Sequence, residues 1–274
     1  MKFLSSLLPI FLASTAIAAP GSASRQERAA ARFNRRAALR NSNPLQPSDL
    51  ESLRIATANN SHVSYSTNWA GAVLVGSGYK TVTGTITVPT PKKPSSGSSS
   101  TQYAASAWVG IDGDTCQTAI LQTGVDFYVK GSTISFDAWY EWYPDYAYDF
   151  TGITVSAGDQ IKMTVTASST SGGSAVINNL TTGKTVTKTF SGESNKLCET
   201  NAEWIVEDFS SGNSLVPFAN FGTVTFTGAS VTTTSGSTLG VTGSEILDIK
   251  QNNQVLTSCS TSGSSTVTCT YTGS

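Results

Sequence analysis

The chain has 274 residues with 17 basic and 18 acidic side chains, so its formal net charge at pH 7 is −1. It contains one histidine, His62, and from Val63 to Ser274 it has neither His nor Arg. That stretch therefore cannot build a Ser-His or Cys-His nucleophile pair, or a zinc site that uses histidine. Proton transfer there would fall to Asp, Glu, Lys and Tyr, which favours a carboxylate enzyme if the domain is catalytic.

The N-terminus has the pattern of a secretory signal peptide. Lys2 supplies a positive charge, Phe3 to Ala13 is a short and mostly apolar run, and Ala16-Ile17-Ala18 offers the small residues of a cleavage site. The apolar run is too short to span a bilayer, and no comparable run follows it. We expect residues 1–18 to be a signal peptide and the protein to be secreted and extracellular, with no membrane anchor.

Residues 19–62 differ in charge from everything that follows. They carry seven Arg and three acidic residues, a net charge of +4, whereas residues 63–274 carry nine Lys and fifteen acidic residues, a net charge of −6. A basic segment can bind nucleic acid or an anionic membrane, but behind a signal peptide it is better explained as a removable propeptide. A flexible basic tail is the plainer alternative. We expect the propeptide to cover the acidic domain at neutral pH and to be cut near Asn59 to Ser64 in acid, with no nucleic-acid or membrane partner.

Residues 63–274 fit one domain and are rich in predicted strands. Short β-branched or alternating segments are separated by clusters of Gly, Ser, Asn and Pro, and no segment keeps a helical apolar period over three turns. The predicted strands include residues 72–75, 81–88, 161–167, 184–190 and 223–226, and residues 89–100 form a solvated loop. The pattern predicts an all-β fold, a two-sheet antiparallel sandwich.

Four cysteines in a secreted chain predict two disulfides, with three possible connectivities. Cys259 and Cys269 flank a Ser-Gly-rich turn and can lie opposite each other on a hairpin. That pairing leaves Cys116 with Cys198, closing a loop of about eighty residues, for which the chain-entropy estimate is about 4 kcal/mol. Free thiol chemistry is the weaker alternative, because residues 63–274 contain no His or Arg to lower a thiol pKa.

Asn179-Leu180-Thr181 has the spacing of a glycosylation sequon within a polar turn. A turn without a glycan is the simpler explanation of the same residues.

The aromatic stretch around residue 140 combines carboxylates with large rings. In a strand, side chains alternate between faces, so Asp137, Trp139, Glu141 and Tyr143 share one face. Two carboxylates beside two aromatic rings are costly to bury without partners, which favours the wall of a cleft. An exposed strand face with scattered aromatics explains the pattern about equally well.

Two further stretches place a single polar side chain on an apolar face. Residues 118–123 read as a strand on which Gln122 shares a face with Ile120 and Thr118, and Glu207 shares a face with Ile205 and Phe209. A carboxylate on an apolar face has a raised pKa or a specific partner, and both situations are common at active sites. Each signal alone is weak.

Together these blocks resemble the glutamic peptidases, or eqolisins, which are acid endopeptidases secreted mainly by filamentous fungi. The resemblance rests on residues 68–71 (NWAG), 108–113 (WVGIDG), 117–124 (QTAILQTG), 139–144 (WYEWYP) and 203–209 (EWIVEDF), and it covers about Ser64 to Tyr271. It implies a lectin-like, jelly-roll type sandwich. Its catalytic residues fall on Gln122 and Glu207, and its substrate-binding residues on Trp69, Asp112, Asp137, Trp139, Glu141 and Tyr143.

The mechanism that the resemblance implies uses a Gln/Glu pair on a protein or peptide substrate. Glu207 would activate a water and later deliver a proton to the leaving amine, while the Gln122 amide would stabilise the oxyanion by roughly 3 kcal/mol. Which of these roles Glu207 performs first stays open. We expect a monomer that needs no cofactor and no metal.

Two other classes of protein are alternatives. A pepsin-type aspartic peptidase needs two Asp-Thr-Gly or Asp-Ser-Gly elements, and this chain has only Asp114-Thr115-Cys116. A glycoside hydrolase or a lectin on a similar sandwich is more plausible, with Glu141 and Glu207 as the two carboxylates of a retaining site.

Overall fold

The computed structural model describes residues 40–48 and 63–274, all within the unit Arg36–Ser274 of the two units into which the chain divides. Within these described ranges there is no α-helix, and hence no helix long and apolar enough to cross a membrane. The expected signal peptide and residues 59–62 of the expected processing region, His62 included, lie outside the described residues.

The larger main sheet has nine strands among the described residues, in the order β18-β17-β3-β12-β5-β6-β7-β8 with β2 beside β17. Only the β2–β17 pair is parallel. The strands are β2 (Val63–Ser66), β3 (Trp69–Val75), β5 (Gln102–Ile111), β6 (Ile120–Lys130), β7 (Thr133–Tyr143), β8 (Tyr148–Asp149), β12 (Asn201–Glu207), β17 (Glu245–Gln251) and β18 (Gln254–Val255).

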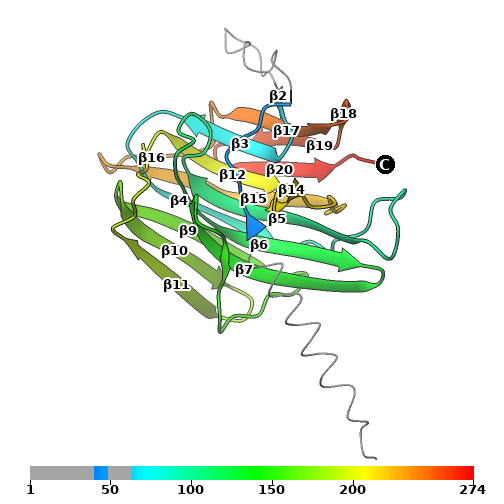
Figure 1. The fold of residues 1–274 in the computed structure, drawn as a ribbon. Helices are drawn as coiled ribbons and strands as arrows, with labels where there is room; N and C mark the ends of the chain where they lie inside the picture. The colour runs from blue at the N-terminus through cyan, green and yellow to red at the C-terminus, as the bar shows by residue number, and fades with distance from the viewer. Residues whose placement is uncertain (1–39, 49–62) are drawn as a thin grey trace, which may run out of the picture. The chain divides into compact units, whose positions relative to one another are not determined.

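The second main sheet has eight strands within the same described ranges, in the order β11-β10-β9-β4-β15-β20-β19 with β16 beside β15. They are β4 (Tyr79–Thr87), β9 (Gln160–Ser169), β10 (Gly172–Asn179), β11 (Lys184–Ser191), β15 (Thr223–Thr233), β16 (Thr238–Leu239), β19 (Thr257–Ser262) and β20 (Thr266–Tyr271). A small third sheet joins β1 (Arg40–Asn41), β13 (Ser210–Ser211) and β14 (Ser214–Leu215). Figure 1 shows the two main sheets as separate layers.

The alternation of side chains along each strand builds the core between these layers. On β12, Trp204 and Val206 point into the main hydrophobic cluster, which the eight-stranded sheet shares, while Ile205 belongs to a separate cluster on the opposite face. Trp204 also donates its indole N–H to the Thr83 carbonyl of β4 over 2.8 Å, which links the two sheets. Full burial of each large apolar side chain stabilises the fold by about 2 kcal/mol. The predicted all-β antiparallel sandwich is confirmed.

The predicted strand segments lie within β3, β4, β9, β11 and β15, with Val88 just past the end of β4. One boundary was wrong: β6 begins at Ile120, not at Thr118. The residues before Ile120 form an irregular loop instead, because Cys116 is tied to Cys198 and Asp112 to the backbone near it. In the predicted loop of residues 89–100, Pro91 and Pro94 are buried and most other residues are exposed or half-buried.

Both expected disulfides are present. Cys116 and Cys198 have Cα atoms 6.1 Å apart, and Cys259 and Cys269 have Cα atoms 4.1 Å apart. Cys259 pairs directly with Cys269 in the ladder of β19 and β20, as expected for a hairpin. None of the four thiols is free, so the alternative of thiol chemistry fails.

The sequon asparagine is not a free surface amide. Asn179 is 1% exposed, and its Nδ2 donates to the Thr154 carbonyl and to the Asp159 carboxylate. Its Oδ1 accepts the backbone N–H groups of Thr181 and Thr182. The side chain therefore organises the turn after β10, and a glycan on this nitrogen would remove one of its two N–H donors.

Candidate active site

The face of the nine-stranded sheet that points away from the main core carries three rows of side chains across β12, β5, β6 and β7. Residues opposite each other in an antiparallel ladder point to the same face, so the register defines each row. The first row is Glu203, Gly110, Gln122 and Glu141. The second is Ile205, Trp108, Gly124 and Trp139, and the third is Glu207, Ser106, Asp126 and Asp137.

The middle row forms an aromatic floor between the two polar rows. A Cβ on Gly124 would lie 2.5 Å from Cβ of Trp108 and 2.9 Å from the Trp139 ring, so only glycine allows both indoles to pack there. Trp69 packs edge-on against Trp108 with ring centroids 4.9 Å apart. The floor thus holds Gln122 on one side and Glu207 on the other.

Glu207 ends β12 and is fully buried. Its Oε2 accepts the indole N–H of Trp108 over 2.8 Å, while its Oε1 has no hydrogen-bond partner. Burial raises the pKa of Glu207 to about 7, although Arg40, the nearby Ser42 hydroxyl and the Trp108 indole lower it. A carboxyl group with this pKa is protonated in acid and can exchange a proton with a substrate.

Gln122 is also fully buried, and its amide has one donor engaged. Its Nε2 donates to the backbone carbonyl of Ser42 over 3.1 Å, and its Oε1 has no hydrogen-bond partner. The side chain that the sequence placed on an apolar face therefore presents an N–H to a peptide carbonyl.

That carbonyl belongs to residues 40–48, which we call the covering segment. Figure 1 shows its strand β1, in blue, in front of the nine-stranded sheet. β1 pairs with β13, and beyond it the backbone of Ser42 binds both Gln122 and Glu141. Further along, the segment makes backbone hydrogen bonds to Gly113, Tyr65 and Thr67. Three side chains of the domain also bind its backbone: Asn68 at Asn43, Pro44 and Gln46, Trp69 at Asn43, and Gln117 at Leu45.

Arg40 anchors the covering segment in an acidic pocket. Its guanidinium binds Asp126 through Nε and Nη2, the latter at 2.9 Å, and lies 3.5 Å from Glu141. The guanidinium carbon lies 3.8 Å from the ring centroid of Trp139 and 4.5 Å from that of Phe209. Burial lowers the pKa of Arg40, but Asp126 and Glu141 more than offset it and hold that pKa above its usual value. The pocket is built for a cation.

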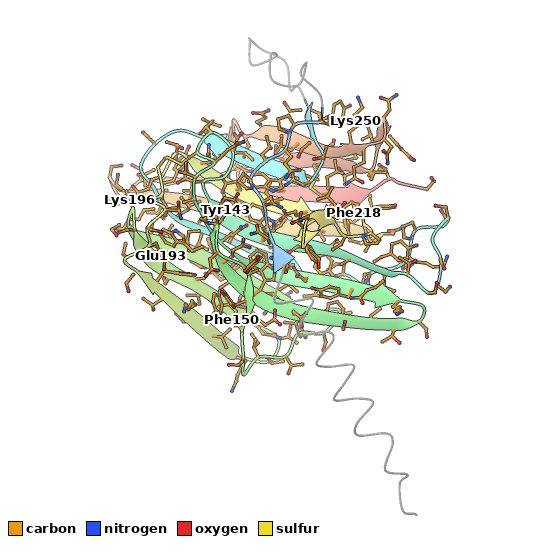
Figure 2. The ribbon with its side chains drawn as sticks, in the orientation of Figure 1. Tyr143, Phe150, Glu193, Lys196, Phe218 and Lys250 are labelled. Carbon is orange, nitrogen blue, oxygen red and sulfur yellow. A yellow bond between two sulfur atoms is a disulfide. The ribbon has the colours of Figure 1, made fainter. Side chains whose placement is uncertain are left out.

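Five of the six expected substrate-binding residues lie at or beside this segment. Trp69 donates to Asn43, and Trp139 and Glu141 contact Arg40. Burial raises the pKa of Asp137 to about 7, helped by Asp149 and Asp126. Tyr143 packs on the aromatic cluster at the end of β7, and Figure 2 labels it there. That these residues bind substrate remains a proposal.

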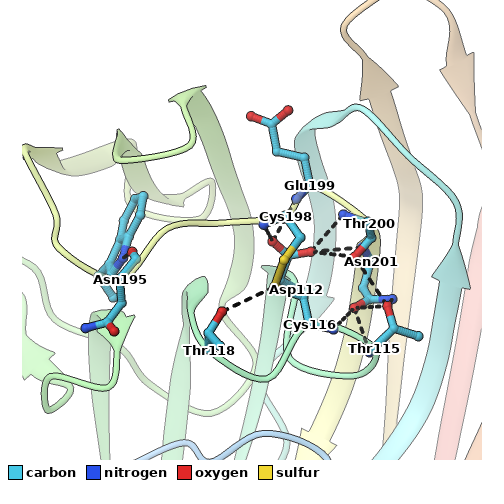
Figure 3. Close-up of a disulfide and its surroundings, with 10 residues drawn as sticks. Asp112, Thr115, Cys116, Thr118, Asn195, Cys198, Glu199, Thr200 and Asn201 are labelled. Atoms are coloured by element: carbon cyan, nitrogen blue, oxygen red, sulfur yellow. Dashed lines mark hydrogen bonds between the residues drawn. A yellow bond between two sulfur atoms is a disulfide. The ribbon is translucent and has the colours of Figure 1, made fainter.

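Asp112 differs from the other five. Its two oxygens accept the backbone N–H groups of Cys198, Glu199, Thr200 and Asn201 at 2.7 to 3.2 Å. Figure 3 shows these bonds around the Cys116–Cys198 disulfide. Asp112 therefore holds this loop in place. Its own backbone has a positive φ of 71°.

Asp126, Ser106, Trp108 and Phe209 reach the site but were not expected there. The alternation along β6 was a usable signal, since Gln122, Gly124 and Asp126 occupy one face in succession. Trp108 lay inside a recognised motif, but nothing in the sequence pairs its indole with Glu207. Arg40 was one of seven arginines, and no local pattern distinguishes it.

One group of metal-ligand types occurs in the described part of the chain, Asp112 with Cys116 and Cys198. The two sulfurs form a disulfide and the carboxylate is occupied by backbone N–H groups, so this group does not fit a metal.

Comparison with known proteins identifies the family. Residues 67–271 match the Peptidase A4 family. The chain belongs to this family. It is 54% identical to aspergillopepsin-2 of Aspergillus niger and 46% identical to scytalidopepsin B of Scytalidium lignicola, over 99% of this chain and 100% of each relative.

Solved structures of Peptidase A4 relatives agree with this assignment. Scytalido-glutamic peptidase with a transition state analog inhibitor has a TM-score of 0.68 and 52% identity, covering 75% of this chain and 98% of that one. Aspergilloglutamic peptidase from Aspergillus niger has a TM-score of 0.60 and 64% identity, covering 62% of this chain and 99% of that one. The resemblance to glutamic peptidases is confirmed. The chain is a peptidase, and the glycosidase or lectin alternative is not favoured.

Proposed function

We propose that this chain is the precursor of a secreted acid endopeptidase that hydrolyses protein substrates with the pair Gln122 and Glu207. The observation that carries the proposal is the Ser42 peptide carbonyl, which Gln122 binds from one side while Glu207 lies beside the Ser42 side chain. A substrate carbonyl at the same position would meet one hydrogen-bond donor and one carboxyl group. Those are the two groups that amide hydrolysis needs.

The proton balance follows from the environment of Glu207. Because burial raises its pKa to about 7, Glu207 starts protonated in acid. A water oxygen attacks the substrate carbonyl carbon and loses a proton to the Glu207 carboxyl group, whose own proton passes to the amide nitrogen. The C–N bond then breaks, and the products are a carboxylic acid and an amine. Gln122 Nε2 donates to the carbonyl oxygen as its negative charge grows, a contribution of roughly 3 kcal/mol at comparable sites.

The covering segment supplies the inhibited state of the precursor. It fills the site with a peptide whose Ser42 carbonyl accepts from Gln122, and Arg40 places a positive charge in the acidic pocket beside Asp126 and Glu141. Residues 19–62 would thus act as an inhibitory propeptide. Burial raises the pKa of Glu141, Asp137 and Glu207, so in acid these groups protonate while the guanidinium stays charged, and the attraction weakens.

Secretion is supported by the signal-peptide pattern and by two disulfides, which persist in oxidising compartments. The proposed mechanism uses no cofactor, since Glu207 transfers the protons and Gln122 stabilises the oxyanion.

The deciding experiment incubates the matured protein with a protein substrate at about pH 4, with and without an inhibitor of pepsin-type enzymes. We expect new amino groups to appear at the same rate in both samples. A parallel incubation with glycans tests the alternative. New reducing ends without new amines would replace the peptidase by a glycosidase.

A further inference from the structure

The covering segment is aligned on the catalytic pair in a definite register. The Ser42 carbonyl oxygen accepts from Gln122, and the Ser42 N–H lies 3.2 and 3.3 Å from the two oxygens of Glu141. The next carbonyl, that of Asn43, accepts from Trp69 over 3.0 Å and from Asn68 over 3.3 Å. The peptide bond between Ser42 and Asn43 is therefore held on both sides, with its carbonyl on the oxyanion donor.

We propose that the Ser42–Asn43 bond is a cleavage site of this enzyme in its own chain. The proposal rests on the proposed function and adds a substrate bond to it. Water attacks the Ser42 carbonyl carbon and gives a proton to Glu207, the C–N bond breaks, and the Asn43 nitrogen leaves with a proton from Glu207. The products are a chain ending in the Ser42 carboxyl group and a chain beginning with the Asn43 amine.

The Ser42 side chain explains why the bond survives while the segment is tightly held. Its hydroxyl lies beside Glu207, and neither Ser42 Oγ nor Glu207 Oε1 has a well-aligned hydrogen bond. The hydroxyl thus takes the space next to Glu207 from which a water would attack. Loosening the anchor at Arg40 would let water reach Glu207.

Acid provides that loosening. The titratable groups that interact electrostatically with Arg40 lie on four strands of the nine-stranded sheet. They are Asp126 and Tyr128 on β6, Asp137 and Glu141 on β7, Asp149 on β8 and Glu207 on β12. Burial raises the pKa of Glu141, Asp137, Asp149 and Glu207, so their protonation in acid removes part of the negative charge around Arg40 while Arg40 itself stays charged.

The test follows the intact precursor by mass spectrometry after it is shifted from neutral to about pH 4. We expect early fragments that end at Ser42 and begin at Asn43, at a rate that does not change over a tenfold range of protein concentration, since the bond lies in the protein's own site. Ser42→Ala should speed this cut several-fold. Ser48→Ala at the other end of the segment is the matched control and should not change its rate.

Glu207→Gln and Gln122→Ala precursors should remain uncut under the same conditions. Should the wild-type precursor digest added protein in acid while no end at Ser42 or Asn43 forms at any time, the cleavage site is refuted although the peptidase stands. If no added protein is digested after maturation either, the proposed function itself is refuted.

A second inference rests on a different side chain, Glu203. It lies in the same row as Gln122, with only Gly110 between them, and all three lie on the active-site face. Glu203 is fully buried and neither of its oxygens has a hydrogen-bond partner, and the same is true of Gln122 Oε1. A Cβ on Gly110 would lie 3.2 Å from Glu203 Oε2, so the carboxyl group projects over the glycine toward the β6 side of the row.

We infer that Glu203 is a positioning residue for Gln122, its O–H acting on Gln122 Oε1 across Gly110 through one bridging water. When its oxygen accepts such a hydrogen bond, the Gln122 amide keeps its N–H directed at the substrate carbonyl. Without that bond the amide group can rotate and place its oxygen, which cannot donate, next to the substrate carbonyl. Burial raises the pKa of Glu203 well above its usual value, and Asp112 and Asp114 raise it further, so the carboxyl group is protonated and can donate.

Glu203→Gln and Glu203→Leu separate this role from packing, because both fill the space and only Gln keeps a donor. We expect Glu203→Leu to lower kcat about tenfold with little change in KM, and Glu203→Gln to keep most of kcat. Thermal unfolding of both variants reports the packing contribution. Equal kcat in the wild type and both variants, or equal losses in Gln and Leu, would refute the positioning role while leaving the assignment of Gln122 and Glu207 untouched.

Discussion

Trp108 donates its indole N–H to Glu207 Oε2 over 2.8 Å, from the strand next to that of the carboxyl group. The bond fixes one oxygen of Glu207 and leaves Oε1 facing the covering segment without a partner. It also stabilises the ionised form, which lowers the pKa of Glu207 against the effect of burial. The indole therefore orients the carboxyl group and tunes its proton affinity.

Trp108→Phe tests both roles of the indole. The ring is kept and the N–H is lost, so the pKa of Glu207 should rise further. If activity requires protonated Glu207, the alkaline limb of the profile of kcat against pH should move to higher pH, and kcat should fall. A profile that keeps its alkaline limb in the Phe variant would contradict this.

The proposed catalytic pair, Gln122 and Glu207, gives the next prediction. Glu207→Gln should abolish most peptidase activity, and Gln122→Ala should lower kcat by about 10² to 10³, the usual cost of losing an oxyanion donor. The double variant should lose little more than Glu207→Gln alone, because residues that act as one unit are not additive. Glu141→Gln should impair activity less, through the pocket that holds Arg40.

Steady-state rates on a protein substrate check these values, with circular dichroism to confirm the fold. A Glu207→Gln enzyme with substantial acid activity would rule out Glu207 as the proton-transfer residue.

Local sequence was sufficient to predict the strands and to place Trp139 and Glu141 on one face, because successive side chains of a strand alternate between its two faces. It was also sufficient to single out Gln122 and Glu207, through the family resemblance. It was not sufficient for Asp126 as the partner of Arg40, since 86 residues separate them and only the register of β5, β6 and β7 builds the pocket. It did not predict the hydrogen bonds of Asp112, which depend on a loop that a distant disulfide closes.

Buried carboxyl groups predict that stability falls as the pH rises. The pKa is raised to about 7 in Glu207 and Asp137 and to about 6 in Asp114 and Asp248, in each case mainly by burial. The folded state therefore binds more protons than the unfolded state, whose carboxyl pKa values are about 4. Their contribution is fully present below about pH 4 and is lost as the pH rises through 6 to 7.

Thermal unfolding between pH 4 and pH 8 measures this effect. Tm should fall over that range, and more steeply in the matured domain than in the precursor, because Arg40 lowers the pKa of Glu207, Glu141 and Asp137. A Tm that rises toward neutral pH would show that other groups dominate.

The acidic pocket predicts a substrate preference. Arg40 lies two residues before Ser42, the residue whose carbonyl Gln122 binds. Peptides with Arg two residues before the residue that supplies the cleaved carbonyl should be cut with kcat/KM about tenfold higher than matched peptides with Leu, since a buried charged hydrogen bond contributes about 1.5 kcal/mol or more. Asp126→Asn should remove this preference, whereas Glu193→Gln, with the same change of charge, should keep it. An unchanged preference in Asp126→Asn would assign it to another group.

Inhibition by the propeptide should depend on two kinds of arginine in different ways. Arg40 is buried against Asp126 and Glu141, and removing one partner of a buried, hydrogen-bonded charge pair costs about 2 kcal/mol or more, so Arg40→Gln should weaken inhibition at least about 30-fold. Salt should change that loss little, because buried pairs are weakly screened.

Arg32, Arg35 and Arg36 lie outside the described residues and are expected to act through long-range attraction between the segment and the acidic domain. Their joint replacement by Gln should weaken inhibition at low salt and have a vanishing effect at about 1 M salt, where the screening length falls to about 3 Å. Inhibition constants of propeptide variants on the matured enzyme, measured at neutral pH over a salt series, distinguish the two. Equal salt dependence for Arg40→Gln and for the triple variant would mean that Arg40 does not enter the pocket.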